Sequence, residues 1–233
     1  MELRSTIHWY WYHFSKLALQ AAESLVFNPQ YTGVANIPPT GAVLMVSNHQ
    51  SHLDPPLVGA GCPRMMNYVA RDTLFRFKPF GWLIRSYNAI PIDRDGTALS
   101  GIKETLKRLK RGEMVLVFPE GTRTRNGDVG RFRPGFSTLA IRSGAVILPV
   151  AIEGAYAAWP RENHLPHPGR VHIHFGEPIP TEEAKKYEER ALVTEVERRV
   201  RYYHAQLRRH VAFSGPTNHR SQDRLVRASS PGN

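Results

Sequence analysis

Short apolar runs alternate with helical patterns along most of the chain after the turn-forming segment 36–41. Such runs, rich in Val, Ile, Leu and Met, are typical of buried strands. The runs that we predict to be strands are 42–47, 65–70, 89–92, 114–118, 146–152 and 171–175. Their alternation with helices predicts an α/β fold in a single domain, with a central, mostly parallel or mixed sheet flanked by helices.

Two helices are predicted inside this domain. In 98–111, leucine and isoleucine recur at helical spacing and Gly112 follows as a stop signal. A longer, highly charged helix is expected from Thr181 to about Arg209 or His210, because it follows two prolines and has acidic residues in its first turn.

Residues 7–27 predict an amphipathic helix with an aromatic N-terminal half. Apolar residues spaced alternately by four and three form one stripe, and polar residues form the opposite stripe. The apolar stripe is Ile7, Trp11, Phe14, Ala18, Ala21 and Leu25, and the polar stripe is His13, Lys16, Gln20 and Glu23. The charges argue against a membrane-spanning helix, whereas the aromatic rings favour a helix lying in the headgroup region of a membrane. The alternative is a helix whose apolar stripe packs on the core of the domain.

The charge balance indicates what kind of partner to expect. Lys and Arg number 31 against 20 Asp and Glu, a formal net charge of +11, which favours nucleic acid, anionic lipid or a phosphorylated substrate. The polar, basic segment 214–233 is expected to be a disordered tail. We therefore divide the chain into an N-terminal helix with its linker (1–35), a central domain (36–213) and this tail. The single cysteine, Cys62, excludes an internal disulfide, and the N-terminus lacks the pattern of a secretory signal.

His49 and Asp54 follow the apolar run 42–47, with four residues between them. A neutral imidazole accepts a hydroxyl proton near neutral pH, and a carboxylate on its other nitrogen fixes the tautomer and stabilises the imidazolium. The pair therefore predicts a general base, His49, that Asp54 orients. The same segment allows a rival chemistry, in which His49, His52 and Asp54 are ligands of a divalent metal.

A second polar segment follows the apolar run 114–118. Its residues are Glu120, Gly121, Thr122 and Arg123. A guanidinium forms paired, charge-assisted hydrogen bonds with phosphate, and glycine lets backbone amides approach an anion. One interpretation is an anion-binding loop, which Arg94 could join from the end of the run 89–92. The other is a surface turn with an ion pair between Glu120 and Arg123.

From about Asn36 to Gly176 the chain resembles the glycerophospholipid acyltransferase family, in particular the bacterial 1-acylglycerol-3-phosphate acyltransferases. The resemblance rests on four segments in the order in which the family has them. They are Asn48-His49 through Asp54, Ile90-Pro91-Ile92-Asp93-Arg94, Phe118-Pro119-Glu120-Gly121-Thr122-Arg123 and Val146-Ile147-Leu148-Pro149-Val150. The first and third are specific in combination, whereas the second and fourth are mostly apolar strand ends.

The resemblance implies that 36–213 is a catalytic domain that transfers a fatty acyl group from acyl-CoA or acyl carrier protein to the sn-2 hydroxyl of 1-acylglycerol-3-phosphate (lysophosphatidic acid), giving phosphatidic acid. His49 would deprotonate the acceptor hydroxyl and Asp54 would orient His49. Arg94 and Arg123, with Gly121 and Thr122, would bind the phosphate, and Glu120 would order that phosphate-binding site. The implied reaction needs no metal and no cofactor besides the thioester co-substrate. The implied location is peripheral, on the cytoplasmic face of the cell membrane.

Two other functions stay open at this point. One is an acyltransferase of the same family that acts on a different lipid or glycolipid acceptor. The other is a non-catalytic protein that binds lipid or nucleic acid through its positive charge. Nucleic-acid binding is disfavoured, because the aromatic residues cluster near the N-terminus whereas the arginines are dense near the C-terminus. We therefore expect a membrane lipid surface, and no nucleic acid, as partner.

Overall fold

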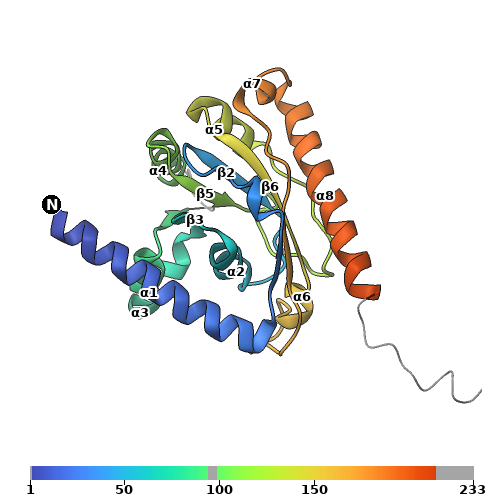
Figure 1. Cartoon of the computed structure of the whole chain (residues 1–233). Coiled ribbons are helices and arrows are strands. Elements are labelled where there is room, and N and C mark those ends of the chain that lie inside the picture. The colour runs from blue at the N-terminus through green and yellow to red at the C-terminus, as the bar shows by residue number, and fades with distance from the viewer. Residues whose placement is uncertain (1, 94–98, 214–233) are drawn as a thin grey trace, which may run out of the picture.

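One mixed β-sheet runs through the centre of the computed structural model (Figure 1). Within the described residues, 2–93 and 99–213, seven strands form it in the order β1-β7-β6-β2-β5-β3-β4. The strands are β1 (Gln30–Thr32), β2 (Val43–Ser47), β3 (Met66–Arg71), β4 (Ala89–Ile92), β5 (Met114–Val117), β6 (Val146–Glu153) and β7 (His172–Phe175). Neighbouring strands are parallel except β6 and β7, which are antiparallel. The predicted fold class is confirmed.

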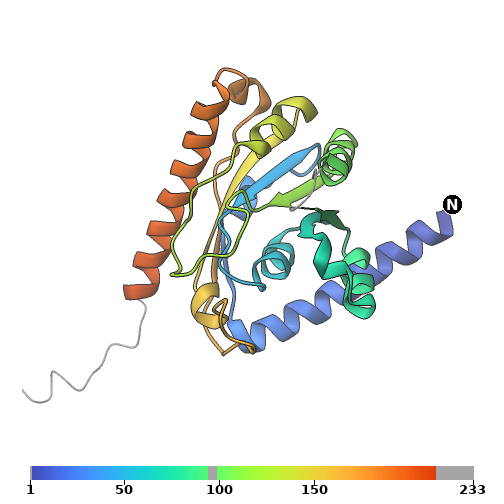
Figure 2. The same cartoon turned by 180° about the vertical axis from the view of Figure 1, so that it is seen from behind.

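Helices cover both faces of the sheet. The helices are α1 (Glu2–Phe27), α2 (Asp54–Gly61), α3 (Lys78–Ser86), α4 (Leu99–Lys110), α5 (Gly135–Ser143), α6 (Ala155–Ala158), α7 (Thr181–Ala184) and α8 (Glu189–Phe213), with 3₁₀ turns at Val34–Asn36 and Asp72–Phe75. Figures 1 and 2 show α4, α5 and α8 on one side of the sheet and α2 on the other, with α1 running past α2 and α3. The helix predicted at residues 98–111 is thus found as α4.

Alternate residues of each strand enter two different hydrophobic cores, because successive side chains of a strand point to opposite faces. From β2, Val43 and Met45 pack with Leu57 of α2 in one core. Leu44 and Val46 pack in the second core, which α4, α5 and α8 close with residues such as Leu109, Phe136, Leu192, Val196 and Val200. Since both faces of β2 are covered, its apolar run is continuous, as expected for a central parallel strand.

Two predicted elements differ from the structure. The short edge strand β1, Gln30–Thr32, was not predicted; it pairs with β7 through its backbone although its side chains are polar or exposed. The single long helix expected from Thr181 is wrong, because the structure has α7 and α8 with a break at 185–188. At this break the amides of Lys186 and Tyr187 bond to carbonyls three residues earlier, and the turn lets Tyr187 pack on the second core.

The polar stripe of α1, rather than its apolar stripe, faces the domain. Lys16 Nζ donates a hydrogen bond to the carbonyl of Cys62, and Gln20 Nε2 donates to that of Ala60 at 2.6 Å. Glu23 is only 3% exposed. The apolar stripe points outward, and the exposed residues of the helix include Ile7, Trp11, Phe14, Leu17 and Leu25. The alternative in which the apolar stripe packs on the core is therefore wrong.

The exposed apolar surface continues from α1 onto α3. The ring centroids of Trp11, in α1, and Trp82, in α3, lie 5.9 Å apart. Both rings are exposed, and so are Phe77 and Phe80 in the same part of the sequence as Trp82. In residues 2–93 and 99–213, no helix is both long and apolar enough to cross a bilayer. A continuous exposed aromatic surface that two helices form together is typical of an interaction site.

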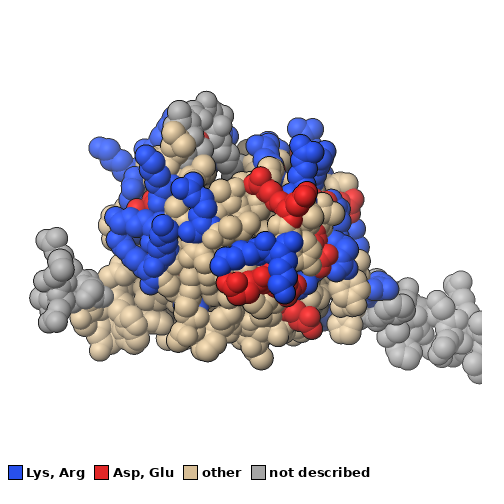
Figure 3. Space-filling view, turned by 90° about the horizontal axis from the view of Figure 1, so that it is seen from above, with Lys and Arg blue, Asp and Glu red and all other residues tan. Residues whose placement is uncertain are grey.

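Charged side chains gather on a different face. Figure 3, seen from above the view of Figure 1, shows Lys and Arg predominating over Asp and Glu on the side where α4, α5 and α7 lie. On α4, Lys103, Lys107 and Lys110 are all exposed, as expected for a solvated helix face.

Two predictions fall outside the described residues: the anion-binding role of Arg94 and the tail at 214–233.

Candidate active site

His49 and Asp54 lie together at the carboxyl end of β2. The chain leaves β2 after Ser47, turns, and enters α2 at Asp54. The Nδ1 atom of His49 lies 2.7 Å from Oδ2 of Asp54. The same oxygen accepts hydrogen bonds from the amides of Gln50 and Ser51 at 2.6 and 2.8 Å. Because the Asp54 carboxylate is wholly buried and held by three donors, it fixes the orientation of the His49 ring.

The opposite edge of the His49 ring is open to a ligand. The ring stacks on Phe118, with centroids 4.1 Å apart and an interplanar angle of 18°, and 15% of the side chain is exposed. Within the described residues, no hydrogen bond occupies Nε2 of His49, while Nδ1 is bound to Asp54. The arrangement therefore presents one imidazole nitrogen that can accept a proton from a bound hydroxyl group.

Glu120 joins the two sequence motifs through the backbone. It follows β5, the parallel neighbour of β2, and its Oε1 accepts a hydrogen bond from the amide of His49 at 2.9 Å. Its Oε2 accepts one from the amide of Gly130 at 3.0 Å. Burial raises the pKa of this carboxyl to about 7, although the two amide donors act in the opposite direction. Both oxygens of Glu120 therefore accept hydrogen bonds from backbone amides, one in each of two loops.

Gly121, Thr122 and Arg123 form the turn that follows. Gly121 has a φ of 74°, a left-handed conformation that favours glycine, and its amide donates to the carbonyl of Phe118 at 3.1 Å. Thr122 is exposed and Arg123 is half-buried. Burial, followed by the charge of Arg161, lowers the pKa of the Arg123 guanidinium. The ion pair between Glu120 and Arg123 that defines the surface-turn interpretation is not present.

The described residues can also be searched for the metal site that His49, His52 and Asp54 were considered to form. Within the described residues, no group of three His, Cys, Asp or Glu side chains has the placement of a metal site. The His52 ring contacts Trp159 in an edge-on arrangement, with ring centroids 5.6 Å apart. Burial lowers the pKa of the His52 imidazole.

His49 lies at the wall of a cavity of about 830 Å³. Most of the wall is apolar and comes from α1, α2, α3 and the strand ends, including Leu19, Pro56, Val69, Leu74, Leu83 and Ile84. Its polar part contains His49, His52, Thr122, Arg123 and Arg161. A volume of this order suits an elongated apolar ligand, and the few polar groups beside His49 are placed to fix its orientation.

Comparison with known proteins identifies the family. A family model described as Acyltransferase matches residues 28–153, more than half of the 233-residue chain. The chain belongs to the acyltransferase family. It is 31% identical over 169 residues to the 1-acyl-sn-glycerol-3-phosphate acyltransferase of Bacillus subtilis, covering 72% of this chain and 82% of that protein. The enzyme of the same name from Pseudomonas aeruginosa is 32% identical over 148 residues, with 62% and 56% covered.

A solved structure extends the likeness to the fold. The crystal structure of the 1-acyl-sn-glycerophosphate (LPA) acyltransferase PlsC from Thermotoga maritima superposes with a TM-score of 0.77 and 28% sequence identity. The superposition covers 89% of this chain and 84% of that one. The part of this chain that superposes is thus longer than the segment 28–153.

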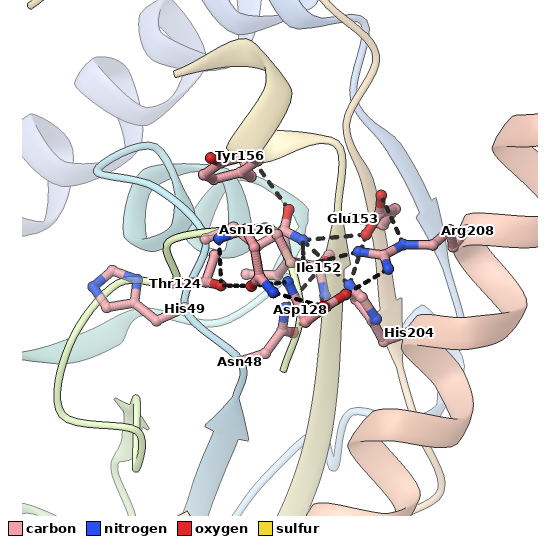
Figure 4. Close-up of polar contacts among 12 residues, drawn as sticks. Asn48, His49, Thr124, Asn126, Asp128, Ile152, Glu153, Tyr156, His204 and Arg208 are labelled. Atoms are coloured by element: carbon pink, nitrogen blue, oxygen red, sulfur yellow. Dashed lines mark hydrogen bonds and ion pairs between the residues drawn. The ribbon is translucent and has the colours of Figure 1, made fainter. Parts of the chain in front are cut away.

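A polar network, buried at Gln50 and His204 and exposed at Arg208 and Asp128, connects α8 of this acyltransferase to the segment that carries His49 (Figure 4). His204 Nε2 lies 2.6 Å from Glu153 Oε2. Gln50 Nε2 donates to Glu153 at 3.1 Å and to the carbonyl of Gly127 at 2.8 Å. Arg208 pairs with Asp128 at 2.6 Å. In Figure 4 the His49 ring points away from this network, so these residues support the segment from behind.

Several of these supporting residues could not be found from the sequence. Gln50 lies inside the first motif, so that proximity to His49 is the only signal it carries. Glu153, His204 and Arg161 are separated from that motif by about a hundred residues or more, and no local pattern marks them. Arg94 was predicted as a phosphate ligand and lies outside the described residues, so this role stays a prediction.

Proposed function

We propose that this acyltransferase transfers a fatty acyl group from acyl-CoA or acyl carrier protein to the sn-2 hydroxyl of 1-acylglycerol-3-phosphate. The observation that carries the proposal is the bond of 2.7 Å between His49 Nδ1 and Asp54 Oδ2 at the wall of the apolar cavity. The names of the Bacillus subtilis, Pseudomonas aeruginosa and Thermotoga maritima relatives support the same acceptor.

In this proposal His49 is the general base. Its Nε2 accepts the proton of the acceptor hydroxyl while the hydroxyl oxygen attacks the thioester carbonyl carbon. The resulting tetrahedral intermediate collapses, the carbon–sulfur bond breaks, and the thiol leaves with the proton returned by His49. Asp54 keeps Nδ1 protonated and stabilises the imidazolium through its charge. Because the hydroxyl attacks the thioester directly, no acyl-enzyme is formed.

The cavity and the second motif support the choice of a lipid phosphate as acceptor. The apolar wall of the cavity suits an acyl chain, since each buried methylene contributes about 0.8 kcal/mol. Arg123 and Thr122 line the same cavity as His49. A guanidinium there suits a phosphate group. Glu120 contributes by ordering the loops, as its bonds to the amides of His49 and Gly130 indicate.

The outward face of α1 supports a peripheral position on a membrane, which we place on the cytoplasmic side. Phe14 is 72% exposed and Leu17 is 65% exposed on this face. Trp82 of α3, and Phe77 directly before α3, are exposed as well. Helices of this kind bury their apolar face at the boundary between headgroups and acyl chains. Because the inner face of α1 lines the cavity through Tyr12, Lys16 and Leu19, docking would bring the cavity to the lipid surface.

The decisive experiment compares the wild type with His49→Ala in mixed micelles that contain lysophosphatidic acid and a long-chain acyl-CoA or acyl carrier protein thioester. Phosphatidic acid is followed by mass spectrometry. We expect product from the wild type and a loss of roughly a hundredfold or more in the variant, because general-base catalysis contributes about that much. Product formation should be the same with and without a metal chelator.

Two results would overturn the proposal in different ways. Absence of phosphatidic acid with both kinds of donor would exclude lysophosphatidic acid as acceptor and direct the search to other lipids of the same family. Inhibition by the chelator would restore the interpretation of His49, His52 and Asp54 as metal ligands.

A further inference from the structure

Arg161 lies beside Arg123 although 37 residues lie between them in the sequence. Arg161 follows α6, beyond the segment 28–153 that matches the family model. Its Nη1 donates a hydrogen bond to Oγ1 of Thr122 at 3.3 Å. Thr122, Arg123 and Arg161 all line the apolar cavity, and all three also line a second cavity of about 600 Å³ whose lining residues are mostly polar. The two guanidinium groups therefore meet where the two cavities adjoin.

The segment that carries Arg161 is fastened to the loop between His49 and Asp54. Ser51 Oγ donates to the carbonyl of Trp159 at 3.0 Å. The indole of Trp159 donates to the carbonyl of Asn163 at 2.9 Å, which closes the turn around Arg161. The position of Arg161 is thus tied to the same loop that orients His49, which is what a residue that places a substrate against a base requires.

The positive charge at this junction is not neutralised by the acids around it. Within the described residues, neither Arg123 nor Arg161 forms an ion pair with a carboxylate, while Glu120 is bound to two backbone amides and Asp128 to Arg208. Burial, followed by the charge of Arg161, lowers the pKa of the Arg123 guanidinium, and the charges of Asp54 and Glu162 act in the opposite direction. Two like charges held this way are stabilised when an anion binds between them.

We propose that Arg161 and Arg123 form a clamp of two guanidinium groups that binds the phosphate monoester of the acyl acceptor. This inference rests on the proposed function and adds a residue that lies outside the four sequence motifs. A phosphate monoester carries up to two negative charges near neutral pH, so that two guanidinium groups match it, whereas a phosphodiester carries one. Arg161 is a substrate-binding residue and a source of preference for monoester acceptors.

The test measures KM for lysophosphatidic acid and for acyl-CoA separately, as surface fractions in mixed micelles, for the wild type and Arg161→Ala. Removing a charge-assisted hydrogen bond of this type should raise KM for lysophosphatidic acid roughly tenfold or more, with KM for acyl-CoA unchanged. Arg161→Lys should give an intermediate KM, because lysine keeps the positive charge but lacks the paired N–H donors of the guanidinium. Arg142→Ala, on the exposed surface of α5, is the matched control and should equal the wild type.

A second arm replaces lysophosphatidic acid by lysophosphatidylglycerol, a phosphodiester. The ratio of kcat/KM for monoester over diester should fall in Arg161→Ala, a change that a general loss of stability would not produce. An unchanged KM for lysophosphatidic acid in Arg161→Ala would overturn the inference, and so would a rise confined to acyl-CoA, which would assign Arg161 to the donor. Both outcomes differ from failure of the proposed function, in which the wild type itself forms no phosphatidic acid.

Discussion

The imidazole of His204 and the carboxylate of Glu153 are 2.6 Å apart in the interior of the protein, where the side chain of His204 is 7% exposed. Burial alone would raise the pKa of Glu153, but the hydrogen bond and charge of His204, with the charge of Arg208, hold it below its usual value. The pair also contacts Gln50, the residue after His49. The C-terminal helix α8 is thereby coupled to the segment that carries His49.

We predict that His204→Ala destabilises the protein and slows turnover. The substitution removes the partner that lies 2.6 Å from the Glu153 carboxylate, and the loss of such a charged hydrogen bond typically costs about 1.5–3 kcal/mol. It should lower the urea midpoint of unfolding and reduce kcat several-fold, with KM less affected. His210→Ala, an exposed histidine of the same helix, is the control and should stay within about 0.5 kcal/mol of the wild type. Equal midpoints for His204→Ala and the wild type would contradict the coupling.

Asp54→Asn should remove the negative charge beside His49, the proposed base, and keep the hydrogen bonds that orient its ring. One oxygen, Oδ2, accepts all three hydrogen bonds, while Oδ1 is buried without a partner among the described residues. The amide of asparagine can therefore take the place of Oδ1 while its oxygen keeps the three donors. The negative charge that stabilises the imidazolium is lost, and we expect kcat to fall by roughly a hundredfold or more.

The measurement for Asp54→Asn is kcat in mixed micelles together with thermal unfolding. The midpoint of unfolding should change little, because the shape and the hydrogen bonds are retained. Nearly wild-type turnover in a folded Asp54→Asn protein would show that the carboxylate charge is dispensable, and the proposed division of roles between His49 and Asp54 would then be wrong.

The central strands and the two motifs could be read from the sequence because each depends on neighbouring residues. Val43–Ser47 is buried on both faces, so its run is continuously apolar, and His49 and Asp54 are separated by one short turn. The strand Gln30–Thr32 has no such signal, since its place in the sheet depends on backbone bonds to β7. The proximity of Arg161 to Arg123 depends on the contact between Ser51 and Trp159, which no local pattern records.

The orientation of α1 shows a second limit of sequence patterns. The spacing of apolar and polar residues defined two faces of the helix, but it could not tell which face contacts the domain. That choice depends on Lys16 and Gln20 meeting the free carbonyls of Cys62 and Ala60 at the end of α2. Terminal carbonyls of a helix need donors, and here the polar stripe of another helix provides them.

Glu23 should make the stability of the protein depend on pH. Its carboxylate is buried, neither oxygen has a hydrogen-bond partner among the described residues, and burial raises its pKa from 4.5 to about 7. The folded protein therefore holds this proton more tightly than the unfolded chain does. By linkage, the group lowers the free energy of unfolding as pH rises from about 4.5 through about 7.

We predict that Glu23→Gln is more stable than the wild type at about pH 8, by up to about 3 kcal/mol, and similar to it near pH 5. Urea unfolding at both pH values measures the difference. Glu177→Gln, at an exposed position, is the control and should match the wild type at both. A difference between Glu23→Gln and the wild type that is the same at both pH values would show that Glu23 does not titrate in this range.

The outward face of α1 can be tested for membrane binding with a pair of aromatic substitutions. Phe14 is 72% exposed on α1, and Tyr202 is 53% exposed on α8, on another side of the protein (Figures 1 and 2). Burying a phenyl side chain contributes about 1.5–3 kcal/mol, so Phe14→Ser should weaken cosedimentation with anionic lipid vesicles roughly tenfold or more. Tyr202→Ser should bind like the wild type. Equal vesicle binding by Phe14→Ser and the wild type would exclude this face as the membrane contact, because its most exposed ring would then contribute nothing.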